Sequence, residues 1–168
     1  MGTTPAIGGV ALKLYLKSLA FLVLVPGTVL GVGPFLIHLT DVGRLALGPA
    51  RWLGLALVVP GAVLLLWCFH LFVAVGRGMP APIDAPTVFV AEGPYRVVRN
   101  PMYVAVVALV SGEAVIYQHV LILAYALVLW LGFNAFVRLN EEPRLQKRFG
   151  ASYEAYVARV PRWIPRFG

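Results

Sequence analysis

Long uncharged runs alternate with polar blocks along this chain. Residues 18–39 and 52–75 are each long enough to cross the hydrocarbon core of a bilayer as a helix, at about 1.5 Å per residue. Two shorter apolar runs, 102–117 and 120–137, are joined only by residues 118–119, which is typical of a helical hairpin. The pattern predicts an all-α, polytopic membrane bundle with about four transmembrane helices.

The polar segments predict the remaining elements. Residues 76–100 form the longest polar connection, and Pro80, Pro82 and Pro86 should hold its first half extended. Pro101 stands where a helix can begin, because a first-turn residue needs no backbone N–H. Beyond the last apolar run, side chains recur at spacings of three and four and predict a cytosolic amphipathic C-terminal helix, with a break expected at Gly150: these are Leu145, Phe149, Tyr153, Tyr156 and Val160.

Composition supports an integral membrane protein. The chain has 168 residues, of which 60% are hydrophobic and 12% charged, with a mean hydropathy of +0.84. A soluble domain carries roughly twice that charged fraction. We therefore expect a single membrane domain over 1–168, divided into a two-helix anchor (1–75) and a catalytic core that binds the cofactor (76–168).

The basic residues predict the orientation of the protein and its class of partner. Fourteen Lys and Arg outweigh seven Asp and Glu, for a net charge of +7. With four spans, most of these cations fall on one side, so the positive-inside rule predicts a multi-pass protein with both termini in the cytosol. Their position beside apolar runs favours membrane lipids over nucleic acid as the partner. The sequence contains no His/Cys cluster with the spacing of metal ligands, so we expect no metal.

The polar block 92–103 (EGPYRVVRNPMY) is the first candidate site. Arg96 and Arg99 are three residues apart and would share a face if this segment were helical. Two guanidiniums at a bilayer surface can bind a carboxylate or phosphate in fork geometry. The simpler interpretation is a pair of arginines that snorkel to the cytosolic interface.

The polar block 138–156 (RLNEEPRLQKRFGASYEAY) is the second. Glu141 and Glu142 are expected one turn past the end of a transmembrane helix, where acids oppose the helix dipole. Either a salt bridge to Arg138, Arg144 or Arg148, or a ligand with an ammonium group or a ribose diol, would explain them. Glu113, within the third apolar run, should lie near the far interface as a wetted structural acid.

The two blocks together resemble the family of integral-membrane methyltransferases that contains isoprenylcysteine carboxyl methyltransferase and the phospholipid N-methyltransferases. GPYRVVRNPMY and, downstream, EEPRLQKRFGASYEAYVARVPRWIP carry the resemblance, which covers about residues 76–168. It implies S-adenosylmethionine as methyl donor, bound at the cytosolic end of the hairpin. In that family an Arg-His-Pro-x-Tyr element and a Glu-Glu pair contact the cofactor.

Carried over to this chain, the resemblance implies a set of site residues. Asn100 replaces the family's histidine; its amide can donate a hydrogen bond but carries no charge. The implied catalytic residues are Arg99, Glu141 and Glu142. The implied cofactor-binding residues are Tyr95, Arg96, Arg99, Asn100, Pro101, Tyr103 and Glu142.

The chemistry of the cofactor agrees with these residue types. S-adenosylmethionine carries a sulfonium, an ammonium, a carboxylate and a diol, to which arginines and glutamates are complementary. The acceptor is expected to be lipophilic and to enter from the bilayer. A carboxylate or thiolate acceptor needs no base, whereas an amine needs a proton acceptor, for which Glu141 is a candidate.

Two other interpretations stay open at this point. Membrane sterol reductases have a similar helical arrangement and use NADPH, and the Arg96/Arg99 pair is compatible with a phosphate. A small membrane scaffold or lipid sensor without catalytic activity is the other. A scaffold predicts that Arg99→Ala and Glu142→Ala leave function intact, whereas a cofactor site predicts loss of binding in a folded protein.

Overall fold

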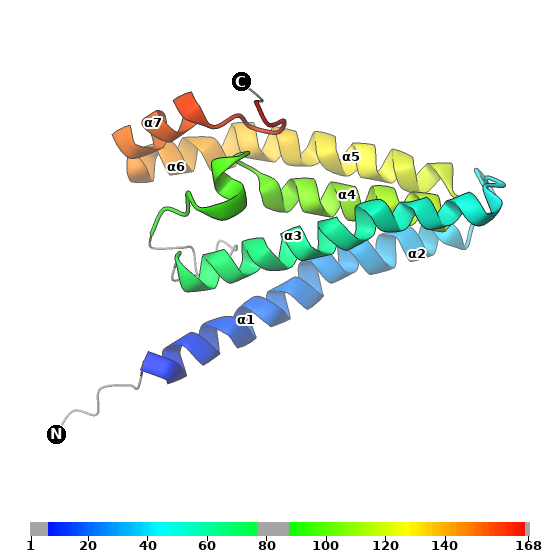
Figure 1. The fold of residues 1–168 in the computed structure, drawn as a ribbon, viewed down its shortest axis with the longest axis horizontal. Helices are drawn as coiled ribbons and strands as arrows, with labels where there is room; N and C mark the ends of the chain where they lie inside the picture. Colours follow the sequence, from blue (N-terminus) through cyan, green and yellow to red (C-terminus); the bar gives the residue numbers. More distant parts are fainter. Residues whose placement is uncertain (1–6, 77–87, 167–168) are drawn as a thin grey trace.

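The computed structural model describes the backbone of residues 7–76 and 88–166, which is helical throughout apart from turns and loops. The all-α prediction is therefore confirmed for these residues. The expected extended segment around Pro80, Pro82 and Pro86 lies outside the described residues. Figure 1 shows long helices running side by side, with the connections gathered at the two ends.

The first helical rod combines three elements: α1 (Ile7–Gly27), the π-helical turn η1 (Thr28–Val32) and α2 (Gly33–His38). The rod begins well before residue 18, where the apolar run starts. The π turn begins two residues after Pro26, which fits a proline that cannot supply an N–H to the α-helical ladder. The last part of the rod packs on α5 (Val120–Phe136), where Tyr125 donates a hydrogen bond to the carbonyl of Val29.

The second rod and the first half of the hairpin form the closest helix pair. The 3₁₀ turn η2 (Gly48–Gly54) leads into α3 (Leu55–Ala74), which packs along α4 (Pro101–Ile116). A Cβ atom at Gly54 would meet the carbonyl oxygen of Gly112, and one at Gly112 would lie 2.7 Å from that of Gly54. Small residues at such a crossing are typical of helices that associate in a membrane.

The second half of the hairpin is longer than the sequence suggested. The prediction that a transmembrane helix ends near Val137 is wrong, because α5 continues through a π-helical segment, η5 (Val137–Glu141), into α6 (Glu142–Phe149). Apolarity does end near Val137, but the polar residues that follow are good helix formers and the backbone stays helical. The chain then turns at Gly150, whose φ is +51°, into α7 (Ala151–Arg159), so the expected break is confirmed.

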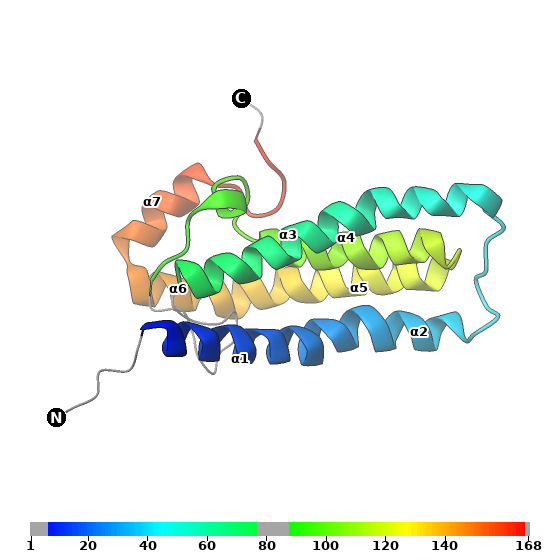
Figure 2. The same cartoon turned by 60° about the horizontal axis from the view of Figure 1, so that its bottom comes forward.

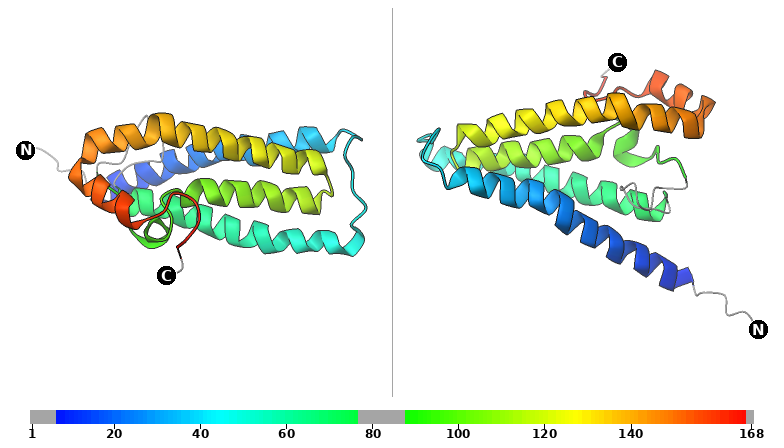
Figure 3. Two further views of the ribbon diagram at one scale, coloured as in Figure 1. Left: turned by 90° about the horizontal axis from the view of Figure 1, so that it is seen from above. Right: turned by 180° about the vertical axis from the view of Figure 1, so that it is seen from behind.

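Among the described residues, three helical segments are long and apolar enough to cross a membrane: Tyr15–His38, Gly48–Ala74 and Val120–Phe149. The apolar helix α4 is shorter. Their outward faces carry many exposed large hydrophobic side chains, which suits contact with lipid. Figures 2 and 3 show that α6, α7 and the C-terminal segment lie at one end of the bundle, and that the connections from α2 to α3 and from α4 to α5 lie at the other.

Candidate functional site

The two polar blocks meet at the α6–α7 end of the bundle, around a cavity of about 280 Å³. Its wall draws on α3, the segment before α4, α4, and the long helix from α5 to α6, with α7 closing one side. The aromatic part of the wall includes Phe72, Phe89, Tyr95, Tyr103, Tyr153 and Tyr156. The polar part consists of Arg99, Asn100, Glu141, Glu142, Arg144 and Arg148.

Most of the site residues named from the sequence line this cavity. Tyr95, Arg99, Asn100, Tyr103, Glu141 and Glu142 all do so. Pro101 is fully buried as the first residue of α4 and supports the wall without lining it. Arg96 is exposed and is not part of the wall, because the segment is a short 3₁₀ turn, η4 (Gly93–Arg96), followed by a loop. The structure therefore does not bring Arg96 and Arg99 onto one helical face.

The turn η4 is anchored by a buried tyrosine. Gly93 adopts φ +55° and lies against the ring of Trp67, so a larger residue there would be strained. The next turn residues bury Tyr95, whose main-chain carbonyl accepts a 2.7 Å hydrogen bond from the Tyr156 hydroxyl of α7. Burial raises the pKa of the Tyr95 and Tyr156 hydroxyls above their ordinary value, so both stay neutral donors. This contact joins the first polar block to the second.

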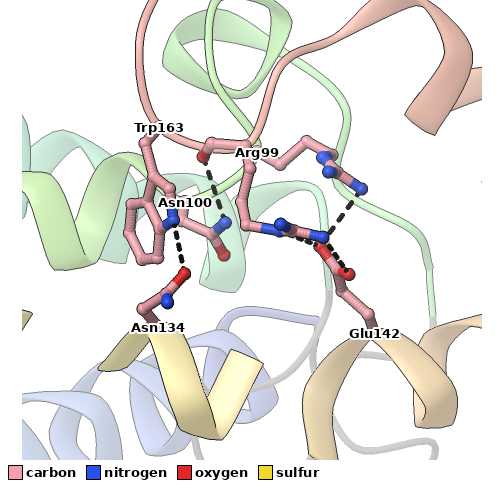
Figure 4. A network of polar contacts seen from close by, with 6 residues as sticks. Arg99, Asn100, Asn134, Glu142 and Trp163 are labelled. Atoms are coloured by element: carbon pink, nitrogen blue, oxygen red, sulfur yellow. Dashed lines mark hydrogen bonds and ion pairs between the residues drawn. The ribbon is translucent and has the colours of Figure 1, made fainter. Parts of the chain in front are cut away.

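Two residues of the polar wall, Arg99 and Glu142, form an ion triad with Arg162 (Figure 4). Arg99 Nη1 lies 3.1 Å from Glu142 Oε1, and Arg162 donates two 2.8 Å hydrogen bonds to the same carboxylate, from Nε to Oε1 and from Nη2 to Oε2. The Arg162 pair has the fork geometry that makes arginine–carboxylate contacts strong. These hydrogen bonds raise the pKa of the Arg162 guanidinium further, so it stays charged. The salt bridges expected for Glu142 from Arg138, Arg144 or Arg148 are therefore replaced by pairs with Arg99 and Arg162.

The C-terminal strap, residues 160–166, crosses over the start of α4. The Arg99 amide donates to the carbonyl of Pro161 at 2.8 Å, and Asn100 Nδ2 donates to that of Arg162 at 3.1 Å. Trp163 Nε1 donates to Asn134 Oδ1 at 3.0 Å, which ties the strap to α5 (Figure 4). Sequence reasoning missed Arg162 and Trp163, because their spacing from the acids follows no periodicity. The one available signal was the excess of acid at residues 141–142.

Glu141 and Glu142 have different partners although they are neighbours. Tyr103, with its ring stacked on Phe133 at 4.6 Å between centroids, donates a 3.0 Å hydrogen bond to Glu141 Oε2. Within the described residues, the hydrogen bond that Glu141 accepts is the one from Tyr103, and it engages Oε2 and not Oε1. The helix changes from π to α geometry between the two acids, so one carboxylate meets α4 and the other meets Arg99 and the strap.

Comparison with known families places the chain. The sequence model of the phospholipid methyltransferase family matches residues 49–152, which is more than half of the chain. The chain belongs to the phospholipid methyltransferase family. A comparison with curated proteins found no match. The match begins before α3, so it reaches further toward the N-terminus than the motif resemblance over 76–168, and it contains the whole hairpin.

The amphipathic pattern predicted for residues 145–160 of this phospholipid methyltransferase family member is confirmed, because its apolar side chains pack together beside the cavity. Tyr153, Tyr156 and Val160 form a buried cluster, against which Leu145, Phe149 and Phe89 pack. The phenylalanine ring at position 89 lies 5.0 Å from that of Tyr156 and 5.8 Å from that of Tyr153, both edge-on. The helical face predicted from spacing therefore contributes Leu145, Phe149, Tyr153 and Tyr156 to the wall of the site.

Two further expectations concern groups away from this wall. The expectation that Glu113 is a wetted acid is wrong for Oε2, which is buried and has no hydrogen-bond partner among the described residues. It lies near the far end of α4, as expected, and takes no part in the cavity. Within the described residues, no group of His, Cys, Asp and Glu side chains is arranged to hold a metal ion.

Proposed function

We propose that this protein transfers a methyl group from S-adenosylmethionine to a lipophilic acceptor that reaches the cavity from the bilayer. The observation that carries the proposal is the cavity itself, in which the family's two polar motifs meet beside lipid-facing helices. Bound there, S-adenosylmethionine would supply a methyl group activated by a sulfonium.

The residues of the wall fit such a cofactor. Arg99 Nε is buried and has no hydrogen-bond partner among the described residues, so a carboxylate or hydroxyl ligand could satisfy it. Glu141 Oε1 is available to a cation or a diol. The aromatic side chains give the remainder of the wall the apolar, ring-binding character of a cofactor pocket. Arg99, Glu141 and Glu142 are thus the proposed catalytic residues, with Tyr95, Asn100 and Tyr103 in the cofactor wall.

The protein would accelerate methyl transfer by orienting the acceptor and the cofactor and by electrostatic stabilisation. A cavity lined by aromatic and paired charged groups can align an acceptor with the methyl group, which supplies much of the acceleration of a displacement. For an amine acceptor, Glu141 could take the ammonium proton before attack, while Tyr103 keeps the carboxylate in place. A carboxylate or thiolate acceptor would leave Glu141 in a binding role only.

The direct test is methyl transfer in vesicles. Purified protein reconstituted with aminophospholipid should move the label of methyl-labelled S-adenosylmethionine into the lipid extract. Glu141→Gln should lower the rate by about 10²-fold or more if the carboxylate acts as a base, and Tyr103→Phe by less, because the ring and its stacking remain. The exposed Glu92→Gln is the matched control and should keep wild-type activity.

Label in a lipid carboxylate ester, with amine lipids inert, would assign O-methylation instead. No label in any lipid fraction, with folded protein, would contradict the proposed function. The proposal also places both termini in the cytosol and the two-helix anchor at 1–75. A reporter that is active only on the non-cytosolic side can be fused to the C-terminus to test that orientation. Activity of this fusion would contradict it.

A further inference from the structure

A second hollow, of about 480 Å³, adjoins the cavity on the other side of the ion triad. Arg99, Glu142 and Tyr153 line both spaces, whereas Arg162 lines only the second, more open one. The rest of the second hollow is lined by Arg138 of η5 and by mostly polar or small residues of α6 and α7, and it opens toward solvent. The triad therefore separates an aromatic cavity from a hollow that water can reach.

The inner cavity is small for a cofactor-sized ligand, so its volume bears on whether the partition opens. Pockets for cofactor-sized ligands usually have volumes of about 300–1,000 Å³. The inner cavity, at about 280 Å³, falls just below that range, and the space beyond the triad is the adjoining volume into which it could extend. A charged, water-soluble ligand would also need a route that avoids the bilayer, and the open hollow is on that route.

Arg162 is the part of this partition that can move most easily. Arg99 is 10% exposed and lies directly before α4, and Glu142 lies within a continuous helix. Arg162, in contrast, is 26% exposed and belongs to a strap without regular secondary structure. Among the described residues, the strap from residue 161 onward makes its hydrogen bonds to Arg99, Asn100, Glu142 and Asn134.

We propose that Arg162 is a latch: its two hydrogen bonds to Glu142 close the passage between the open hollow and the aromatic cavity, and their release admits a charged, water-soluble ligand. The latch would be a positioning residue, since it acts through Glu142. Identifying that ligand with S-adenosylmethionine rests on the proposed function, whereas the passage itself does not.

The passage can be tested without the cofactor. Cys68 is the single cysteine of the chain, so Cys68→Ala combined with Met102→Cys leaves one thiol, on a side chain that lines the inner cavity. The measurement is the rate constant with which a charged, membrane-impermeant thiol reagent modifies this cysteine in nanodiscs. Adding Arg162→Ala should raise the rate about tenfold or more, because the variant loses both hydrogen bonds to Glu142 and the loss of one charge-assisted hydrogen bond is already enough for a tenfold shift of an opening equilibrium.

Matched variants separate a latch from general loosening. Arg166→Ala removes an exposed cation from the same strap and should leave the rate unchanged. Arg162→Lys keeps the charge without the fork and should give an intermediate rate. Trp163→Phe, which removes the hydrogen bond to Asn134, loosens the strap by another route and should also raise the rate, so the test survives if Arg162→Ala does not fold.

An unchanged rate in folded Arg162→Ala, or an equal rise in Arg166→Ala, would overturn the latch. Saturating S-adenosylmethionine adds a separate outcome. Protection of the thiol by S-adenosylmethionine supports the proposed function, and its absence would count against that function while the comparison of Arg162 and Arg166 variants still decides the latch.

Discussion

At the scale of single residues, Glu142 is the group on which the polar wall depends. Its carboxylate faces two guanidiniums, and its side chain is only 19% exposed. Its negative charge offsets the positive charges of Arg99 and Arg162, which the neighbouring aromatic side chains cannot do. Removing it leaves Arg99 with a buried Nε and without the Glu142 carboxylate. Leaving one charge of a buried pair without its partner costs more stability than the pair itself contributes.

Replacing Glu142 by Gln should therefore both destabilise the protein and weaken the site. We expect a loss of about 1–3 kcal/mol in the free energy of unfolding, the range for leaving a partly buried charged partner unpaired. Thermal unfolding in detergent would measure it, with Glu92→Gln as the control on an exposed acid. An unfolding temperature equal to that of wild type would show that the triad contributes no stability.

At the scale of elements, the π-helical segment η5 fixes which way the two acids point. The segment lies between an apolar helix that packs in the bundle and a polar helix that carries the site. A π turn accommodates one extra residue, so it sets the rotation of all that follows. Arg99 and Arg162 then meet the carboxylate of Glu142, whereas Tyr103 meets that of the adjacent Glu141.

Insertion of one alanine after Leu139 tests this role of η5. The Leu139 side chain is 75% exposed, so little packing is lost, but the π turn already holds one extra residue, and α6 should therefore rotate by about 100° relative to α5, because an α-helix has 3.6 residues per turn. We expect unchanged helix content by circular dichroism and loss of S-adenosylmethionine binding. Leu139→Ala keeps the register and should bind as wild type; equal binding by the insertion variant would refute a role for the π turn.

Element types and the pairing of the two blocks were predictable from the sequence, and the details of the wall were not. Apolar run length predicted the spans, and the spacing of Tyr153 and Tyr156 predicted the buried face of α7. The continuity of α5 into α6 was missed because a drop in hydropathy does not stop a helix. Arg162 was missed because its contact with Glu142 depends on a strap whose path no local pattern encodes.

At the scale of the whole molecule, the close approach of the second rod to α4 links the cavity end of the bundle to its far end. The crossing of Gly54 and Gly112 brings the second rod against α4, and the cavity forms at the other end of that same pair, where Phe72 faces the start of α4. A change at the crossing should therefore be felt at the cavity through the angle between α3 and α4.

Gly112→Ala places a Cβ within 2.7 Å of the Gly54 carbonyl oxygen and should cost about 1–3 kcal/mol of stability through overpacking. Gly132→Ala, in the neighbouring α5 with no atom within 4 Å of the added Cβ, is the control and should be neutral. Unfolding of both variants in the same detergent makes the comparison. Equal stability of the two would mean that the bundle adjusts its crossing without cost.

The central claim is that the cavity binds S-adenosylmethionine, and calorimetric titration of the purified protein in detergent tests it most directly. The account predicts saturable binding of S-adenosylmethionine, abolished or strongly weakened by Glu142→Ala and retained by Glu92→Gln, with no binding of NADPH in parallel. Absence of S-adenosylmethionine binding to folded wild-type protein would contradict the account; NADPH binding in its place would indicate a reductase, and binding of neither a scaffold.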